Sequence, residues 1–259
     1  MKVITVTNQK GGVGKSSTAC ALAQAASISG KKALIIELDP QGNLAFFLGV
    51  DTQHGGAYEL LTGEAPAADL IQRSPTGPDV IPASWGLQTI TTGFSGSARR
   101  LAAALEGISS RYDVIFIDTP AAAGELQLNA LMAADTVLIP LQPDSVAVQG
   151  LAQMAETVNQ ICQNGHKVTI AGCFLGNLDH ITARTVLARQ MIDLIKETAA
   201  NLGIPFLGAV RHAVAVQEAQ AFQQNLFEYA PKSAPAIDYM RIYSEVFKPQ
   251  KRKRGKNLS

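Results

Sequence analysis

The ten residues NQKGGVGKSS, numbered 8–17, follow directly on the apolar run VITV at 3–6 and precede an alanine-rich segment. A strand, a glycine-rich loop and a helix in this order form a P-loop, in which backbone N–H groups and the helix N-terminus face phosphate. We therefore predict a nucleotide site. Lys15 would reach the β- and γ-phosphates, and the Ser16 hydroxyl would ligate Mg²⁺. The remaining predicted phosphate contacts are Gly11, Gly12, Val13, Gly14 and Ser17.

Short aliphatic runs alternate with helix-length segments along the chain. Strands are expected at 3–7, 33–37, 80–82, 114–117, 136–140, 168–175 and 205–210, and helices at 16–29, 98–109, 125–133, 146–163 and 184–202. Residues 74–96 are rich in Gly, Pro and Ser and are expected to form loops around one short strand. Nearly continuous apolar strands that alternate with helices are typical of a doubly wound, mostly parallel α/β sheet with helices on both faces.

Composition narrows the class of protein. The chain has 259 residues, 47% of them hydrophobic and 17% charged, and its longest apolar runs are too short to span a bilayer. Three scattered cysteines form no C-x-x-C pair, which is typical of reduced, cytoplasmic thiols. The net charge of +1 is uneven: residues 248–259, KPQKRKRGKNLS, hold six of the 22 Lys and Arg and no acid. We expect one domain over 1–247 and a disordered polybasic tail over 248–259.

The loop departs from the strict pattern G-x-x-x-x-G-K-[ST], because Gln9 stands where its first glycine belongs. Lys10 supplies a second cation near the phosphates, and the residues alone indicate no more than that. The form K-G-G-V-G-K-S resembles the deviant Walker A motif of the ParA/MinD ATPases. That resemblance implies that two subunits dimerise on ATP, and that Lys10 of each acts catalytically on the nucleotide held by the other.

Two acidic stretches follow the loop. LDPQGN at 38–43 comes after the second expected strand, and DVIFIDTP at 113–120 has the form of a Walker B strand that ends in Asp118. An acid at the carboxyl end of a parallel strand can hold Mg²⁺ or position water. LDPQGN is similar to the first switch of Soj-type ParA proteins, which implies that Asp39 orients the attacking water and lies at the metal with Ser16 and Asp118. Glu37 stands where those proteins commonly have aspartate.

The resemblance to Soj-type ParA proteins covers residues 1–247, through YELLTGE at 58–64, LNALMAAD at 128–135 and the stretch 217–246. It departs at 74–97 and at Val210-Arg211-His212, where the family commonly has Pro-Arg-Asn. The family places its adenine-contacting loop after the last strand. Our candidates for nucleotide contacts there are Asn177, Pro205 and Arg211.

Basic residues suggest a nucleic-acid partner, because each neutralised phosphate releases condensed counterions. The resemblance implies non-specific binding of double-stranded DNA by the folded C-terminal half. The tail can equally be a solvated segment without a partner. The candidate DNA contacts are Arg184, Arg189, Arg211, Arg241, Lys251, Arg252, Lys253 and Arg254.

Three other functions share such a loop. Iron–sulfur relatives require cluster cysteines, and Cys162 and Cys173 lack that arrangement. A MinD-like spatial regulator acts on a membrane or a protein assembly, but the tail has one leucine and no apolar stripe, so stable membrane insertion is not expected. A P-loop small-molecule kinase or ligase would need a substrate pocket and no Lys10.

The sequence therefore predicts a cytoplasmic ATPase that uses ATP and Mg²⁺, and the resemblance implies that it is nucleoid-associated. The resemblance implies that it partitions or positions a plasmid, a chromosome or another cargo, and that a ParB-like partner stimulates its slow hydrolysis.

Overall fold

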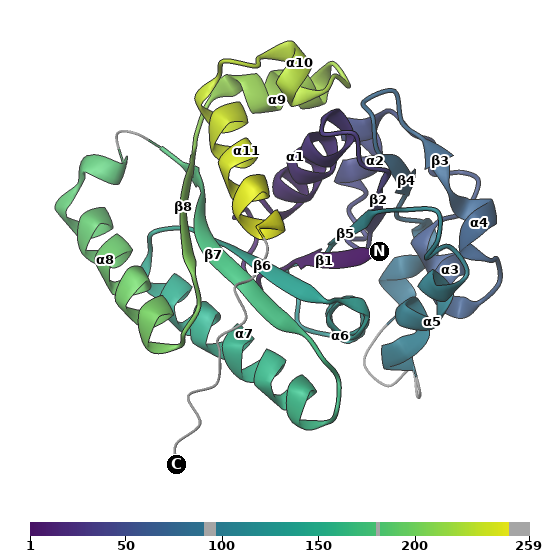
Figure 1. The fold of residues 1–259 in the computed structure, drawn as a ribbon, viewed down its shortest axis with the longest axis horizontal. Helices are drawn as coiled ribbons and strands as arrows, with labels where there is room; N and C mark the ends of the chain where they lie inside the picture. Colours follow the sequence, from purple (N-terminus) through teal and green to yellow (C-terminus); the bar gives the residue numbers. More distant parts are fainter. Residues whose placement is uncertain (91–96, 180–181, 249–259) are drawn as a thin grey trace.

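A computed structural model describes residues 1–90, 97–179 and 182–248. Eight strands form one sheet in the order β3-β4-β2-β5-β1-β6-β7-β8, and only β3 runs antiparallel to its neighbour (Figure 1). The strands are β1 (Lys2–Val6), β2 (Ala33–Glu37), β3 (Gln72–Arg73), β4 (Asp79–Ile81), β5 (Val114–Asp118), β6 (Thr136–Leu141), β7 (Thr169–Leu178) and β8 (Phe206–Arg211).

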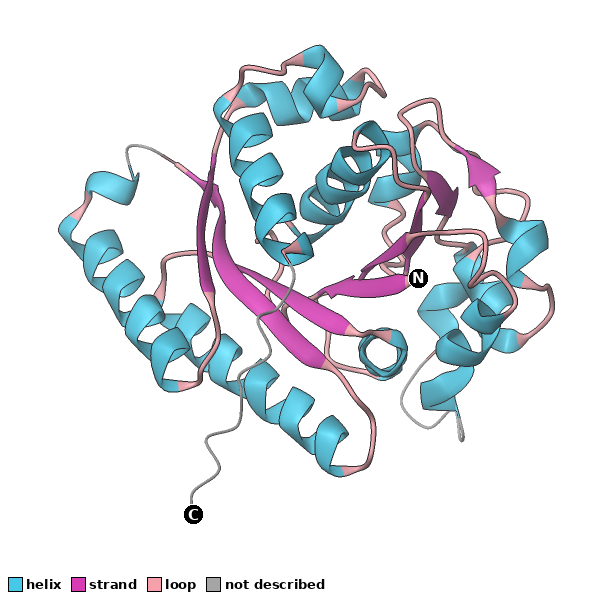
Figure 2. Cartoon of the chain, viewed as in Figure 1, coloured by secondary structure: helices cyan, strands magenta, loops and turns pink. Residues whose placement is uncertain are grey.

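Helices cover both faces of the sheet (Figure 2). One face packs against α1 (Lys15–Ile28), α2 (Asn43–Leu48), α9 (Val214–Ala221), α10 (Leu226–Tyr229) and α11 (Ala234–Phe247). The other face packs against α3 (Ala57–Thr62), α4 (Ala67–Leu70), α5 (Arg100–Glu106), α6 (Glu125–Ala133), α7 (Ser145–Gln163) and α8 (Val186–Asn201). The predicted doubly wound α/β class is confirmed.

The central strands are buried from both sides, which is why the sequence shows them as unbroken apolar runs. In β5, Val114 and Phe116 belong to the core under α1, whereas Ile115 and Ile117 belong to the core under α5 and α6. All seven expected strands occur, with small shifts at their ends. The expected helix at 98–109 is shorter: a 3-10 turn, Ser97–Arg99, precedes α5, which ends at Glu106.

Among the described residues, no helix has the length and apolarity needed to cross a membrane. The elements that sequence periodicity missed are short or edge elements, such as β3, α2 and α4. Residues 74–90 contain β4 and a 3-10 helix, Trp85–Thr89, and the expected loop at 91–96 lies outside the described residues. Likewise, the predicted tail contacts Lys251, Arg252, Lys253 and Arg254 lie outside the described part of the chain.

Candidate nucleotide site

The phosphate loop connects the carboxyl end of β1 to the first turn of α1. Gly12 and Gly14 have φ of 74° and 87°, in the left-handed region that favours glycine, and Gly14 is the N-cap of α1. No side chain caps this helix end. The N–H groups of its first turn are therefore directed out of the helix, where an anion can accept hydrogen bonds from them.

Neighbouring strands and loops hold the loop in place. The Asn8 amide donates to the carbonyl of Pro140 at 2.7 Å, and its Oδ1 accepts from the N–H of Lys10 at 3.1 Å. The Gln142 amide donates to the carbonyl of Gly12 at 2.9 Å. A conformation fixed by these contacts before ligand binding lowers the ordering cost that binding must overcome.

A cavity of about 460 Å³ opens beside the loop. It is lined by nine of the predicted residues, Gly11, Gly12, Gly14, Lys15, Ser16, Ser17, Asp39, Asn177 and Arg211. Sequence reasoning missed the polar side chains Gln41, Asn43, Gln217 and Gln220 and the aromatic rings of Phe47 and Tyr239, which also line it. Gln41 and Asn43 belong to the LDPQGN motif, and Gln217, Gln220 and Tyr239 to the stretch 217–246, but the sequence alone did not place their side chains at the nucleotide.

Val13 and Pro205 do not line this cavity. The Val13 side chain is fully buried, which leaves only its backbone for phosphate contact. Pro205 lies just before β8, whereas Arg211 ends that strand, and a six-residue strand spans about 20 Å. The structure therefore contradicts our placement of Pro205 at the nucleotide. The segment 205–212 is mostly strand, and only its carboxyl end reaches the site.

Lys15 is almost completely buried and its ammonium donates to the carbonyl of Lys10 at 2.9 Å. Burial lowers the pKa of Lys15, and the charges of Asp118 and Asp39 oppose that shift. The cation thus lies folded over its own loop, close to both predicted carboxylates. Phosphate oxygens in the loop would offer it a stronger, charged acceptor.

Lys10 has a different position from Lys15. Its ammonium pairs with Asp144, whose Oδ1 also caps α7 by accepting the N–H groups of Val146 and Ala147. Lys10 is not among the residues that line the cavity. Within one chain, therefore, the second lysine lies beside its own phosphate loop without pointing into the cavity.

Asp118 ends β5 and lies in register with Val6 of β1 and Glu37 of β2. It is completely buried, and both of its carboxylate oxygens lack a hydrogen-bond partner. Burial raises the pKa of Asp118 to about 8; Glu37 and Asp39 add to the shift, while the nearby Ser16 and Lys15 side chains oppose it. Buried polar groups in proteins are nearly always satisfied, so this carboxylate lacks an expected partner.

These donors fit a magnesium ion. The unpartnered oxygens of Asp118, the Ser16 hydroxyl and the Asp39 carboxylate are hard oxygen ligands. No cluster of three or more His, Cys, Asp or Glu side chains suited to a metal occurs among the described residues. Mg²⁺ commonly uses one or two carboxylates together with phosphate and water, so the small ligand set is consistent with it.

Asp39 lies in the loop between β2 and α2 and lines the same cavity as the phosphate loop. Its Oδ1 accepts the N–H of Gln41 at 3.1 Å, and its carbonyl accepts the N–H of Gly42 at 3.1 Å. Both bonds belong to a local turn of the kind that aspartate favours. The second carboxylate oxygen has no such bond and can accept a hydrogen bond from water in the cavity.

Glu37, two residues earlier, has a structural function that the sequence did not reveal. Its buried carboxylate accepts the N–H groups of Leu44 at 2.6 Å, Ala45 at 3.2 Å and Ala83 at 3.2 Å. Burial raises the pKa of Glu37 to about 7, although the three backbone bonds oppose the shift. Glu37 therefore joins both ends of the Asp39 loop to the end of β4.

At the far side of the cavity, Asn177 has φ of 51° and its Oδ1 lies 2.8 Å from Nδ1 of His212. The guanidinium of Arg211 pairs with Asp238 through two bonds of 2.8 and 3.0 Å. Arg241 lies 3.8 Å from the same carboxylate and donates to the carbonyl of Ala209. Two predicted DNA contacts, Arg211 and Arg241, thus share one acid, whereas Arg184 and Arg189 are exposed.

Known proteins resemble this chain over most of its length. The model of a family described as "AAA domain" matches residues 1–170. The chromosome partitioning protein ParA of Caulobacter vibrioides is 34% identical in an alignment 266 residues long, gaps included. The alignment covers 99% of this chain and 97% of that protein. The chain belongs to the ParA family of partitioning ATPases. The predicted family is confirmed.

Two solved structures share its fold. The apo form of McdA from Cyanothece superposes with a TM-score of 0.85 at 25% identity, covering 95% of this chain and 99% of the other. Cobyrinic acid a,c-diamide synthase from Mycobacterium smegmatis, solved with bound ADP and magnesium, gives 0.78 at 28% identity, covering 94% and 92%. This ParA-family chain is an ATP hydrolase, and ATP and Mg²⁺ are its cofactors.

Proposed function

We propose that this chain is a ParA-type switch: it dimerises on ATP, binds double-stranded DNA without sequence preference and positions a DNA or other cargo. Residues 1–247 would form the ATPase domain and 248–259 a basic tail. A ParB-like protein on the cargo would stimulate a slow, Mg²⁺-dependent hydrolysis. The protein would then be found in the cytoplasm, associated with the nucleoid.

One observation carries this proposal. Lys10 belongs to the phosphate loop, yet its ammonium pairs with Asp144 and does not line the cavity. A lysine that served its own nucleotide would duplicate Lys15, which already lies over the loop. The Lys10 side chain is 30% exposed at the side of the loop, where the nucleotide of a second subunit can offer it phosphate oxygens in place of Asp144.

Each remaining residue has a role that its surroundings support. The loop N–H groups and Lys15 would bind the phosphates, and Ser16 and Asp118 would hold Mg²⁺, which neutralises charge on the transferred group. Asp39 would orient the attacking water. Because phosphoryl transfer needs little covalent help from a protein, positioning and charge stabilisation would carry the reaction.

A DNA-binding measurement tests the proposal. Fluorescence anisotropy of a labelled random-sequence duplex would be followed with ATP, with ADP and without nucleotide, at rising salt. We expect binding that requires ATP and weakens steeply with salt, because it depends on phosphate contacts. Absence of binding with every nucleotide would reject the partition proposal.

A second candidate is a P-loop ligase that acts on a small molecule. It is favoured by the likeness to the diamide synthase, which reaches 28% identity over 94% of this chain. A ligase would turn over ATP only with its acceptor present and would not gain activity from DNA or a partner. Steady ATP hydrolysis that rises with DNA and a cognate partner would exclude it.

A further inference from the structure

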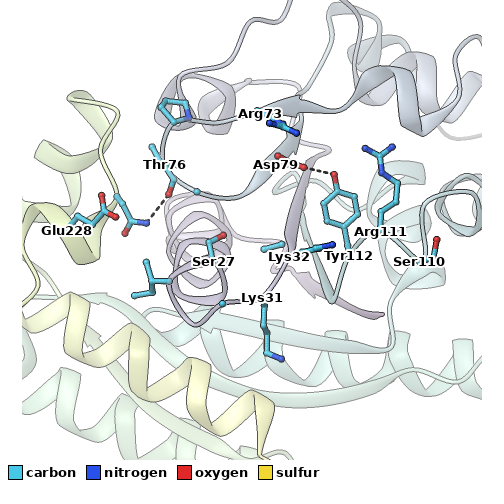
Figure 3. Close-up of a pocket in the computed structure, with 16 residues that line it drawn as sticks. Ser27, Lys31, Lys32, Arg73, Thr76, Asp79, Ser110, Arg111, Tyr112 and Glu228 are labelled. Carbon is cyan, nitrogen blue, oxygen red and sulfur yellow. Dashed lines mark hydrogen bonds between the residues drawn. The ribbon is translucent and has the colours of Figure 1, made fainter.

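A second cavity, of about 900 Å³, lies at the end of the sheet opposite to the nucleotide (Figure 3). Its lining includes Ala33 and Asp79, which begin β2 and β4, and Tyr112, which comes two residues before β5. The phosphate loop follows the carboxyl end of β1, which is parallel to β5. This cavity therefore opens at the amino ends of the parallel strands, and nothing in the ATPase mechanism uses it.

Four cations line this cavity: Lys31, Lys32, Arg73 and Arg111. None of them forms an ion pair with another described residue. The lining holds two acids, Asp79 and Glu228. An excess of unpaired positive charge on concave walls concentrates anions from solution.

The two arginines converge on one polar pair. The Tyr112 hydroxyl donates to Asp79 at 2.7 Å, and Figure 3 shows the guanidinium groups of Arg73 and Arg111 on either side of this bond. Burial raises the pKa of Tyr112, while the charges of Arg111 and Arg73 oppose the rise, so both charges act at the hydroxyl. Both guanidinium groups keep their fork of N–H donors, the geometry that matches phosphate oxygens.

A further polar group faces this cavity without a partner. The Ser27 side chain lines it, and its hydroxyl is buried with no hydrogen-bond partner. By contrast, the nearby Asn225 amide donates to the carbonyl of Thr76 at 2.8 Å.

The basic surface continues beyond the cavity. The ammonium groups of Lys2 and Lys31 lie 5.1 and 5.4 Å from the ring centroid of Phe247. Phe247 ends α11, and the sequence continues from it into the polybasic residues 248–259. Three acids oppose this charge: Asp113 accepts the N–H of Lys32, Glu245 pairs with Lys248, and the charge of Asp135 acts on Lys2. Cations that lie both in the cavity and beyond it suit a long polyanion better than a single small anion.

We infer that this cavity binds phosphate groups of the DNA backbone. The inference rests on the proposed function and locates its DNA contacts at the amino ends of the strands. Arg211 and Arg241, two earlier candidates for DNA contact, share Asp238 and are therefore less available for phosphate. A dimer would carry two such cavities and would gain avidity on long DNA.

The test replaces the two arginines. The double variant Arg73→Gln/Arg111→Gln removes two charges from exposed side chains and leaves the nucleotide cavity intact. Its matched control is Lys167→Gln/Lys232→Gln, which removes two exposed charges elsewhere. Anisotropy with a long random-sequence duplex would be measured with ATP at several salt concentrations, together with ATPase activity without DNA and thermal unfolding.

A phosphate contact contributes up to about eightfold in affinity at 0.1 M salt, given the slope of −0.9 per contact. We expect the arginine variant to bind DNA at least about tenfold more weakly. The slope of log K against log salt concentration should become less negative by about two. Its DNA-independent ATPase activity and melting temperature should equal those of the control. Arg73→Lys/Arg111→Lys, which keeps the charge, should recover most of the binding.

Two failures are distinguishable. If the wild-type chain binds no DNA, the proposed function fails and this inference fails with it. If wild type binds DNA and the arginine variant binds equally well, the inference is overturned while the proposed function stands. A parallel variant, Arg184→Gln/Arg189→Gln, then reports whether the surface at α8 holds the DNA instead.

Discussion

The carbonyl oxygen of Val13 lies so close to Gly176 that a β-carbon at Gly176 would approach it to 2.3 Å. This contact joins the phosphate loop to β7, a strand about 160 residues later in the chain. Atoms essentially never approach at such a distance, so only glycine permits this position of the loop. The conformation of the nucleotide site thus depends on a residue outside its own motif.

Gly176→Ala should displace the phosphate loop from β7 and weaken ATP binding. Because the contact is with backbone and not with a flexible side chain, we expect a loss of about 1–3 kcal/mol in the free energy of unfolding. Isothermal titration with a non-hydrolysed ATP analogue and urea unfolding would measure both effects. Gly107→Ala, where the added carbon meets nothing closer than 4.0 Å, is the matched control. Equal ATP affinity in the two variants would contradict the prediction.

Glu37→Gln should loosen the Asp39 loop. In the native protein, both carboxylate oxygens of Glu37 accept backbone N–H groups. The amide of glutamine keeps only one acceptor oxygen, and its N–H₂ group would face an N–H donor that then has no acceptor. We expect a loss of about 1–3 kcal/mol in unfolding free energy. Trp85, the single tryptophan and 85% exposed, lies two residues after Ala83 and reports by fluorescence on that side of the loop. Glu64→Gln, at an exposed position, should change neither the unfolding free energy nor the Trp85 fluorescence.

Without nucleotide, the protein should become less stable as the pH rises from about 5 to 8. Burial raises the pKa of Glu37 from 4.5 to about 7 and that of Asp118 from 3.8 to about 8. Between those values the folded state binds more protons than the unfolded state, so the unfolding free energy falls with rising pH, by about 1.4 kcal/mol per unit for each group.

Asp118→Asn should remove the Asp118 part of that slope, and the variant should be more stable than wild type at pH 8. It should also lose Mg²⁺-dependent ATP hydrolysis, since the carboxylate would hold the metal. Urea unfolding at several pH values would measure the slope, with Asp69→Asn as an exposed control. An unchanged slope in Asp118→Asn would place the pH dependence elsewhere.

Lys10→Ala should retain ATP binding and lose ATP-dependent dimerisation. Lys15 remains over the loop in this variant, whereas the cation proposed to reach a second subunit is gone. Light scattering with ATP and with ADP would give the mass of the species present. Lys15→Ala should instead fail to bind ATP at all. A Lys10→Ala protein that forms ATP-dependent dimers would refute the role of this lysine between subunits.

Asp39→Ala should trap the ATP-bound state. Without the carboxylate that would hold the attacking water, we expect turnover to fall by about 10²–10⁴ while ATP binding persists. DNA complexes formed with ATP should then outlive those of wild type, as measured by their dissociation rate on addition of competitor DNA. Normal turnover in this variant would remove Asp39 from the mechanism.

The sequence by itself determined the fold class and was enough to propose the phosphate loop and both carboxylates, because each depends on short local patterns: apolar strands, glycine spacing and an acid at a strand end. Lys10 and the missing glycine at Gln9 were sufficient to indicate the family.

Only the tertiary structure decided what surrounds those motifs. It brought Gly176 against the carbonyl of Val13, the Glu37 carboxylate to the N–H groups of α2, and Asp144 into an ion pair with Lys10. It also placed Pro205 at the end of β8 that lies away from the nucleotide cavity. It also brought Lys31, Arg73 and Arg111 into one cavity from three separate segments. Most of these contacts join residues far apart in the chain. Their positions follow from strand order and register, which local patterns do not specify.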